Sequence, residues 1–190
     1  MFGKILRIIV FALVAGAISS AYAQSDQPIK TSLCEIRMHP TDFNHKLVEI
    51  YAIASHGFED SSLVDPSCSN APYFWFEYGG KIVTGTMYCC GLTNARERSE
   101  NLKVDGIAIP LVDDALFKSF DQRLHPKRPK KNKSDTVGAT LQGILFLAPQ
   151  KLGPDYTQYG YGHMGCCILF ALTRVVTVDP AKSPTANNSN

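Results

Sequence analysis

Two cysteine doublets and one histidine are the side chains of this sequence best suited to metal or redox chemistry. They are Cys89, Cys90, Cys166, Cys167 and His163. Thiolates and an imidazole are good ligands for zinc or copper. Zinc sites favour ligands two to four residues apart, however, and adjacent residues of a strand point to opposite faces. The spacing therefore favours disulfides or buried cysteines, with a metal site or a reactive thiol pair as the alternatives.

The cysteine count also favours disulfides. Six cysteines are an even set, which is typical of disulfide bonding in an exported chain. Adjacent cysteines rarely bond to each other, because a disulfide places its two Cα atoms farther apart than neighbouring residues lie. The simplest scheme joins Cys34 to Cys68, and joins one doublet to the other or to only one of its members. The sequence has no Cys-x-x-Cys, the usual spacing of redox dithiols.

His163 lies in the glycine-rich stretch YGYGHMGCC, between Gly162 and Met164. It could act at a barrel mouth as a ligand or an acid–base group. Alternatively, its ring bonds to a nearby carbonyl and fixes the turn into the last strand. A catalytic histidine needs an acid or a nucleophile to act with, and none lies near it in the sequence. We therefore expect no catalytic residue, and a hydrolase using His163 is the weakest hypothesis.

Two aromatic residues are further binding candidates. Trp75 lies in the run YFWFEY, which could be a stacking platform for bases or sugars, or part of a barrel wall. The run has no interleaved basic residues, which favours the wall. Tyr161 shares the glycine-rich stretch with His163. Trp75, Tyr161 and His163 are kept as candidate binding residues.

The charge is unevenly distributed. The formal net charge is +2, but Lys4 and Arg7 belong to a predicted leader, and the remaining chain has 17 basic and 17 acidic residues. Six of these basic residues lie in residues 123–133: Arg123, Lys127, Arg128, Lys130, Lys131 and Lys133. An acidic body with one basic segment does not indicate nucleic-acid binding, which needs a positive face. The segment could contact an anionic envelope component or an acidic protein, or it could be a solvated spacer.

Residues 1–23 predict a secretory signal peptide. Lys4 and Arg7 precede an apolar run at residues 8–18, and Ala21-Tyr22-Ala23 fits a cleavage site. A membrane anchor is the alternative, but the run is shorter than the ~20 apolar residues that span a bilayer. No later stretch is apolar enough to span one. We therefore expect a periplasmic or secreted protein without a membrane span after cleavage, and no cofactor.

Alternation and turn residues predict a mainly β chain. Expected strands are 47–55, 58–65, 73–78, 81–90, 107–112, 136–148 and 166–178. A short helix is expected over residues 32–40, and a second one after Asp113 or Asp114. The apolar stripe of the second helix is Leu116, Phe117, Phe120 and Leu124. Residues 91–106 form a polar excursion, and 179–190 a disordered tail. The pattern fits a small OB-like Greek-key β-barrel over residues 32–178, with one short N-terminal helix and one inserted helix.

Two stretches, HPTDFNHKLVEIYAIASHGFEDSSLVDPSC and GHMGCCILFALTRV, resemble a group of uncharacterised exported bacterial OB-like proteins. The resembling features are His39-Pro40, Phe43, Asn44-His45-Lys46, Val48 to Ala54, Gly57-Phe58-Glu59, Cys68 and Tyr161-Gly162-His163. The chain departs from the group in its cysteine doublets and its basic segment. The resemblance implies an OB-like fold and export, and it carries no catalytic residues.

These patterns together predict an exported, disulfide-containing OB-like module with a non-catalytic binding or envelope-related role. The alternative is a periplasmic metal-binding or thiol-redox protein that uses the cysteine doublets and His163.

Overall fold

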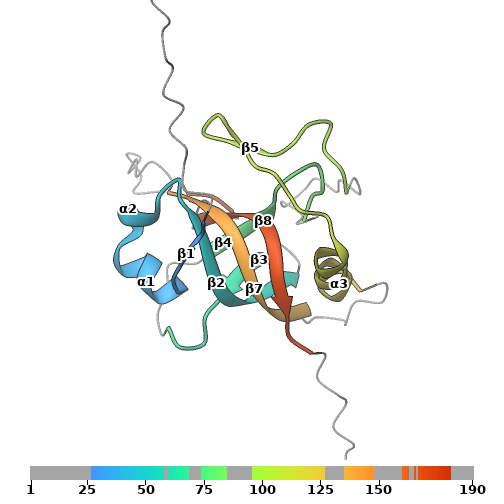
Figure 1. Ribbon diagram of the computed structural model, residues 1–190, viewed down its shortest axis with the longest axis horizontal. Coiled ribbons are helices and arrows are strands. Elements are labelled where there is room, and N and C mark those ends of the chain that lie inside the picture. The colour runs from blue at the N-terminus through green and yellow to red at the C-terminus, as the bar shows by residue number, and fades with distance from the viewer. Residues whose placement is uncertain are drawn as a thin grey trace, which may run out of the picture.

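Five strands close into a barrel (Figure 1). They are β2 (Leu47–Gly57), β3 (Asp60–Val64), β4 (Phe74–Tyr78), β7 (Asp135–Phe146) and β8 (Ile168–Val178). Their order is β2-β3-β4-β8-β7, and β7 pairs with β2 to close the sheet. In this barrel β4 and β8 run parallel, while the other neighbouring strands are antiparallel. This is the strand order of an OB-like Greek-key barrel, so the predicted fold class is confirmed.

The computed structural model describes residues 27–57, 60–68, 74–84, 96–126, 135–147, 160–162, 165 and 167–180. Three short strands in these ranges lie outside the barrel. They are β1 (Ile29–Lys30), which pairs in parallel with β2, and the antiparallel pair β5 (Lys103–Val104) and β6 (Ile107–Ala108). No helix in this part of the chain has the length and apolar character needed to cross a membrane.

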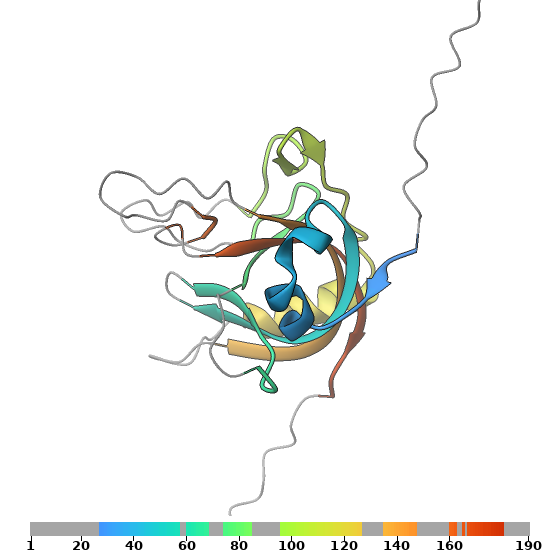
Figure 2. The same ribbon diagram turned by 90° about the vertical axis from the view of Figure 1, so that its left-hand side faces the viewer.

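Helices lie at both ends of the barrel, as Figures 1 and 2 show. They are α1 (Leu33–Met38) and α2 (Pro40–Phe43) at one end, and α3 (Ala115–Leu124) at the other. The single helix expected over residues 32–40 is divided at His39, because proline disfavours helical backbone in the residue before it and suits the first position of a new helix. Asp114 caps α3 by accepting from the Phe117 N–H at 2.9 Å.

The main core fills the barrel and reaches both groups of helices. Alternate residues of β2 point into this core, since Val48, Ile50, Ala52 and Ala54 are fully buried. Strand β4 contributes three large rings to the same core, and the helices add apolar side chains from each end. These core residues are Phe74, Phe76, Tyr78, Leu33, Ile36, Phe43, Phe117, Phe120 and Leu124. The helices therefore close the barrel by burial of their apolar faces.

A second, smaller core lies on the outside of the barrel wall. Trp75 points away from the interior, because successive residues of a strand face opposite sides. It packs with residues of β7, β8 and the chain around β5 and β6: Val104, Ile109, Phe146, Cys167, Leu169 and Ala171. Residues 96–112 therefore cover part of the barrel wall, whereas the sequence predicted a polar surface excursion over residues 91–106.

An arginine fixes this covering segment to β4. Arg98 Nη2 lies 2.6 Å from Glu77 Oε1, and Arg98 Nη1 donates to the carbonyls of Tyr78 at 3.1 Å and Ile82 at 2.6 Å. Of the strand expected over residues 81–90, the described residues 81–84 form only a bridge between Ile82 and Glu97. Of the strand expected over residues 107–112, two residues are extended as β6, since Pro110 cannot continue a ladder.

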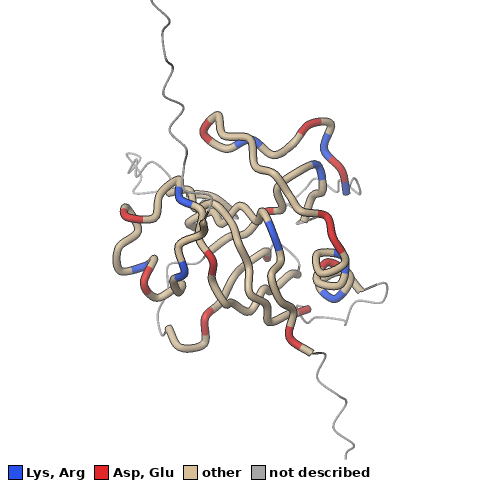
Figure 3. Tube along the Cα trace, viewed as in Figure 1, with Lys and Arg blue, Asp and Glu red and all other residues tan. Residues whose placement is uncertain are grey.

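The described chain ends in a segment that is fixed to the barrel. The Asp179 N–H donates to the Gly138 carbonyl at 2.9 Å, and Tyr51 donates its hydroxyl to the Asp179 carboxylate at 2.7 Å. Arg123 of α3 donates to the Asp179 carbonyl. Most of the tail predicted over residues 179–190 lies outside the described residues. Basic and acidic side chains are interspersed along the described chain (Figure 3).

Candidate functional site

Three of the six predicted disulfide cysteines fall in the described residues, and all three are disulfide-bonded. Cys34 in α1 is bonded to Cys68 after β3, with their Cα atoms 5.5 Å apart, which confirms this predicted pair. Cys167 is also in a disulfide, and its partner lies outside the described residues. Asp65 lies beside Cys34 and Cys68 in an arrangement that could hold a metal ion if the thiols were free. Because their sulfurs are bonded to each other, they offer no thiolate ligand.

Most of the other predicted site residues lie outside the described residues. These are His163, Lys127, Arg128, Lys130, Lys131, Cys89, Cys90 and Cys166. Their predicted roles in binding, in disulfides or in the alternative metal site stay predictions. Trp75 and Tyr161 are described, and both belong to the small outer core.

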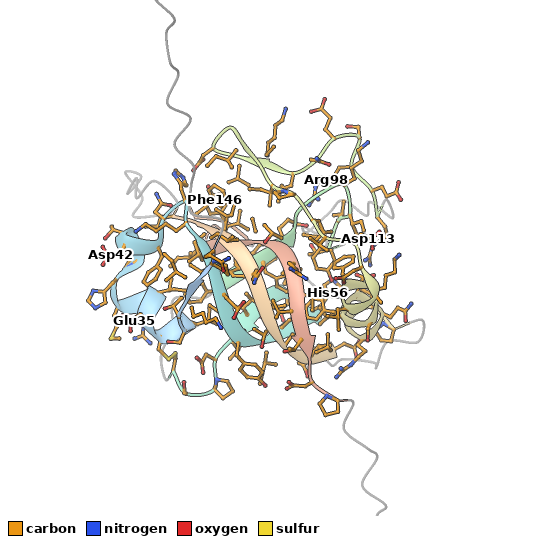
Figure 4. The ribbon with its side chains drawn as sticks, viewed as in Figure 1. Glu35, Asp42, His56, Arg98, Asp113 and Phe146 are labelled. Carbon is orange, nitrogen blue, oxygen red and sulfur yellow. A yellow bond between two sulfur atoms is a disulfide. The ribbon has the colours of Figure 1, made fainter. Side chains whose placement is uncertain are left out.

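The structure brings Tyr161 close to a histidine and an aspartate that the sequence did not single out. His45 Nε2 lies 3.0 Å from Asp105 Oδ2, and both side chains are more than two-fifths exposed. Burial, followed by the charge of Asp105 and a hydrogen bond to its carboxylate, raises the pKa of Tyr161. We name His45, Asp105 and Tyr161 the loop end. Figure 4 shows Phe146, whose ring lies 5.2 Å from that of His45, on the side away from α3.

Backbone geometry fixes His45 and Asp105 at the loop end. His45 (φ 59°) and Asp105 (φ 50°) are the two non-glycine residues with positive φ among the described residues. The His45 N–H donates to the Leu145 carbonyl at 2.8 Å, which locks the turn between α2 and β2. Asp105 and Gly106, with φ of 50° and 79°, form the two-residue turn between β5 and β6. Left-handed backbone in non-glycine residues is concentrated at functional sites, and here both examples touch each other.

The Tyr161 end of the glycine-rich stretch is a closed turn leading into β8. The Tyr161 N–H donates to the Cys167 carbonyl at 2.9 Å, and the Cys167 N–H donates back at 3.0 Å. Gly162 (φ 75°) lies against the ring of Trp75, since a Cβ on it would be 2.5 Å from a ring carbon. Trp75 is only 6% exposed. A ligand could stack on Trp75 only if this turn moved away.

A second group of titratable side chains lies at the opposite end of the barrel, which we name the α3 end. It consists of His56, His125, Asp121 and Tyr78. The rings of His56 and His125 have centroids 4.1 Å apart. His125 Nδ1 lies 2.9 Å from Asp121 Oδ1, and Nε2 lies 2.5 Å from the Thr84 carbonyl oxygen. In Figure 4, His56 lies beside α3.

The protonation equilibria at the α3 end are strongly perturbed. Burial, followed by the charges of His125 and Arg96, lowers the pKa of His56 to about 4. Burial opposes ionisation of Asp121, but the hydrogen bond from His125 and the charge of Arg96, 2.6 Å away, give it a lowered pKa. Burial raises the pKa of Tyr78 well above its ordinary value, so its hydroxyl is neutral.

Sequence reasoning kept only Tyr161 of the loop end as a binding candidate and no residue of the α3 end, for different reasons. At the loop end a signal existed, because Asp105-Gly106 is the dipeptide preferred in two-residue hairpin turns and apolar residues flank it. At the α3 end, His56 and His125 are 69 positions apart and neither lies in a recognisable motif. Only the closed barrel brings them together.

Comparison of the chain with models of protein families, with curated proteins and with solved structures found no match. The family expected from residues 32–178 is therefore not identified, while the small five-stranded barrel that it implied is confirmed.

Proposed function

We propose that this chain is an exported, disulfide-stabilised OB-like binding module of the periplasm, and that it binds its ligand at the loop end without catalysing a reaction. The observation that carries this proposal is the disulfide bonding of every described cysteine in a small barrel, since disulfides persist in oxidising compartments. The signal-peptide pattern of residues 1–23 supports export.

The same observation weakens the alternative, a metal-binding or thiol-redox protein. That alternative uses Cys167 as one of its ligands, and a sulfur in a disulfide is not a thiolate. We propose that the partner of Cys167 belongs to the Cys89-Cys90 doublet, because adjacent cysteines are poorly placed to bond to each other.

The topology supports binding at the loop end. OB-fold proteins bind oligonucleotides and oligosaccharides with the face of their second and third strands and with two loops, one of which joins the fourth and fifth strands. Tyr161 lies in the equivalent connection here, between β7 and β8. His45, Asp105 and Tyr161 offer hydrogen-bonding groups above a layer that contains Trp75 and Phe146. The chain as a whole has few spare positive charges, so a hydroxyl-rich oligosaccharide suits the loop end better than a nucleic acid.

The basic segment at residues 123–133 is a second proposed contact. Lys127, Arg128, Lys130 and Lys131 would attract an anionic envelope component or an acidic protein. Binding of this kind weakens as salt screens the charges. Binding of the protein to vesicles that contain anionic lipid tests this contact. We expect the binding to be lost in a variant in which all four residues are replaced by serine.

Intact mass of periplasmically expressed protein, with and without alkylation, tests export and cysteine state together. We expect a chain that begins at Gln24, lacks six hydrogens and takes up no alkylating agent. Four alkylatable thiols, or a metal lost on denaturation, would instead favour the metal or redox alternative.

Chemical-shift mapping with a panel of soluble cell-wall oligosaccharides tests the binding surface. We expect shifts in the backbone amides around His45, Asp105 and Tyr161, and affinity at least tenfold weaker in Asp105→Asn. Asp113→Asn, which changes an exposed aspartate before α3, is the matched control and should bind like the unmodified protein. Shifts confined to the α3 end, or none with the whole panel, would contradict the proposed surface.

A further inference from the structure

The α3 end contains two neighbouring histidines, His56 and His125, whose ring nitrogens differ in their hydrogen-bond partners. Both nitrogens of His125 face oxygen acceptors, namely the Asp121 carboxylate at 2.9 Å and the Thr84 carbonyl at 2.5 Å. A carbonyl and a carboxylate can only accept, so both bonds form only when both ring nitrogens carry a hydrogen. The geometry therefore fits a positively charged His125.

His56 cannot accommodate a charge in the same way. Its Nε2 is buried and has no hydrogen-bond partner among the described residues. A proton on this nitrogen would gain no acceptor, and it would put a second cation beside His125 at a ring separation of 4.1 Å. The contact between the two rings is therefore stable only while His56 is neutral.

Four titratable or charged side chains act on His56. They are His125, which follows α3, Asp121 of α3, Arg96 of the covering segment and Asp60 of β3. Asp135 of β7 is its cross-strand partner in the backbone register. The two acids that favour protonation already have partners. Ser55 donates to Asp60 Oδ2 at 2.8 Å, and Asp121 binds both Arg96 and His125. Burial and the two cations outweigh them, which lowers the pKa of His56 to about 4.

We propose that His56 and His125 form an acid-sensitive latch that holds the C-terminal end of α3 against the barrel when His56 is neutral and releases it when His56 is protonated. His125 is the residue that follows α3, and its own N–H donates to the Asp121 carbonyl at 2.8 Å. Two further contacts also require the C-terminal end of α3 to lie against the barrel. Leu124 is 1% exposed, and Arg123 holds the segment around Asp179.

The release is local, because the two barrel ends are held differently. At the end where α1 and α2 lie, which we name the α1 end, the Cys34–Cys68 disulfide does not respond to mild acid. The ladder between β2 and β7 is made of backbone hydrogen bonds, which carry no titrating group. Acid should therefore open the last turn of α3 before it opens the barrel. A sensor of this kind would couple periplasmic or external acidity to the exposure of the α3 end.

Amide hydrogen exchange in the full mature chain tests the latch. The readout is the protection of the last-turn amides of α3, including His125, relative to the amides of Ala139 to Leu145 in β7, each corrected for the intrinsic exchange rate. If the released state has an ordinary histidine, its population should rise about 20-fold between pH 7 and pH 5. The β7 amides should change far less.

Two variants show whether His56 is responsible. His56→Gln cannot titrate, and the acid-dependent loss of protection should disappear in it. His39→Gln removes an exposed histidine beside α1 and should keep the full effect. Acid sensitivity that persists in His56→Gln would overturn the latch, as would equal loss of protection in α3 and β7, which indicates global unfolding.

A measurement on the unmodified chain covers the case in which His56→Gln does not fold. Side-chain NMR titration should place the midpoint of His56 near 4. A midpoint near the ordinary histidine value of about 6.5 would overturn the proposal by itself.

Discussion

Helices cover both ends of the barrel, but different interactions hold them in place at the two ends. At one end, α1 is fixed to the loop after β3 by a disulfide, and the side chains of His45 and Asp105, which lie 3.0 Å apart, are exposed. At the other end, α3 is held by packing and by a network of His125, Asp121 and Arg96. The side chains of His45 and Asp105 are 43% and 45% exposed, whereas those of His125 and Asp121 are 14% and 25% exposed. The comparison shows that similar residue types have different functions according to their burial.

The largest difference between the ends should appear when the disulfide is removed. Replacing Cys34 and Cys68 by alanine should lower the free energy of unfolding by about 2–5 kcal/mol, because the unfolded chain gains conformational freedom. Urea unfolding of the variant and the parent measures this. If the loss is below 1 kcal/mol, the α1 end is held by packing alone and the contrast between the ends fails.

Acid should weaken the α3 end by the next largest amount. The pKa of His56 falls from 6.5 in the unfolded chain to about 4 in the folded protein, so the unfolded chain binds more protons between these values. Stability is therefore lost as the pH falls from about 6.5 to 4. The loss should be about 2–3 kcal/mol, allowing for the partial exposure of the ring. Thermal or urea unfolding at pH 7, 5.5 and 4 measures it.

His56→Gln provides the control for this pH dependence, since the remaining slope over the same range must come from other groups. Asp121 contributes in the same direction but only at lower pH, because its pKa is lowered from an already acidic value. A full slope in His56→Gln would assign the acid sensitivity to groups elsewhere.

A pair of matched substitutions should give the smallest effects and the sharpest comparison. Asp121→Asn leaves Arg96 and His125 without their carboxylate and should lower the free energy of unfolding by about 2 kcal/mol. Asp105→Asn changes a more exposed ion pair and should alter it by less than about 1 kcal/mol. Chemical denaturation of both variants measures the two changes in the free energy of unfolding. Equal changes would mean that the difference in burial between the two ends has no effect on stability.

Local patterns predicted the parts of the fold that depend on local physics. Alternation identified β2 as a strand with two distinct faces, and Asp114 and Leu124 mark the beginning and end of α3 as expected. Leu116 was expected in the apolar stripe of α3 but is 41% exposed, because a stripe defined by spacing does not fix the rotation of a helix against the barrel. The Cys34–Cys68 pair followed from the cysteine count and the exclusion of adjacent bonds.

The candidate sites were less predictable, because they depend on contacts between distant segments. Trp75 was expected in the barrel wall or on an open stacking platform, and the structure places it on the outer side of the wall, beneath Gly162. This position requires residues 96–112 to fold back over the wall, which polarity alone does not indicate. His56 meets His125 only after α3 has docked, so no sequence window contains the pair.

The ladder that closes the barrel also determines the order in which this chain can fold. It joins residues that are 79 positions apart at His56 and Asp135, and 97 positions apart at Leu47 and Ile144. Contacts over such separations form late, since the entropy of closing the long intervening chain is lost first. The Cys34–Cys68 bond closes a much shorter loop of the N-terminal part and does not shorten this path. The edge of β2 that pairs with β7 is therefore exposed until β7 is in place, and an unpaired strand edge is a site at which a second copy of the chain can pair.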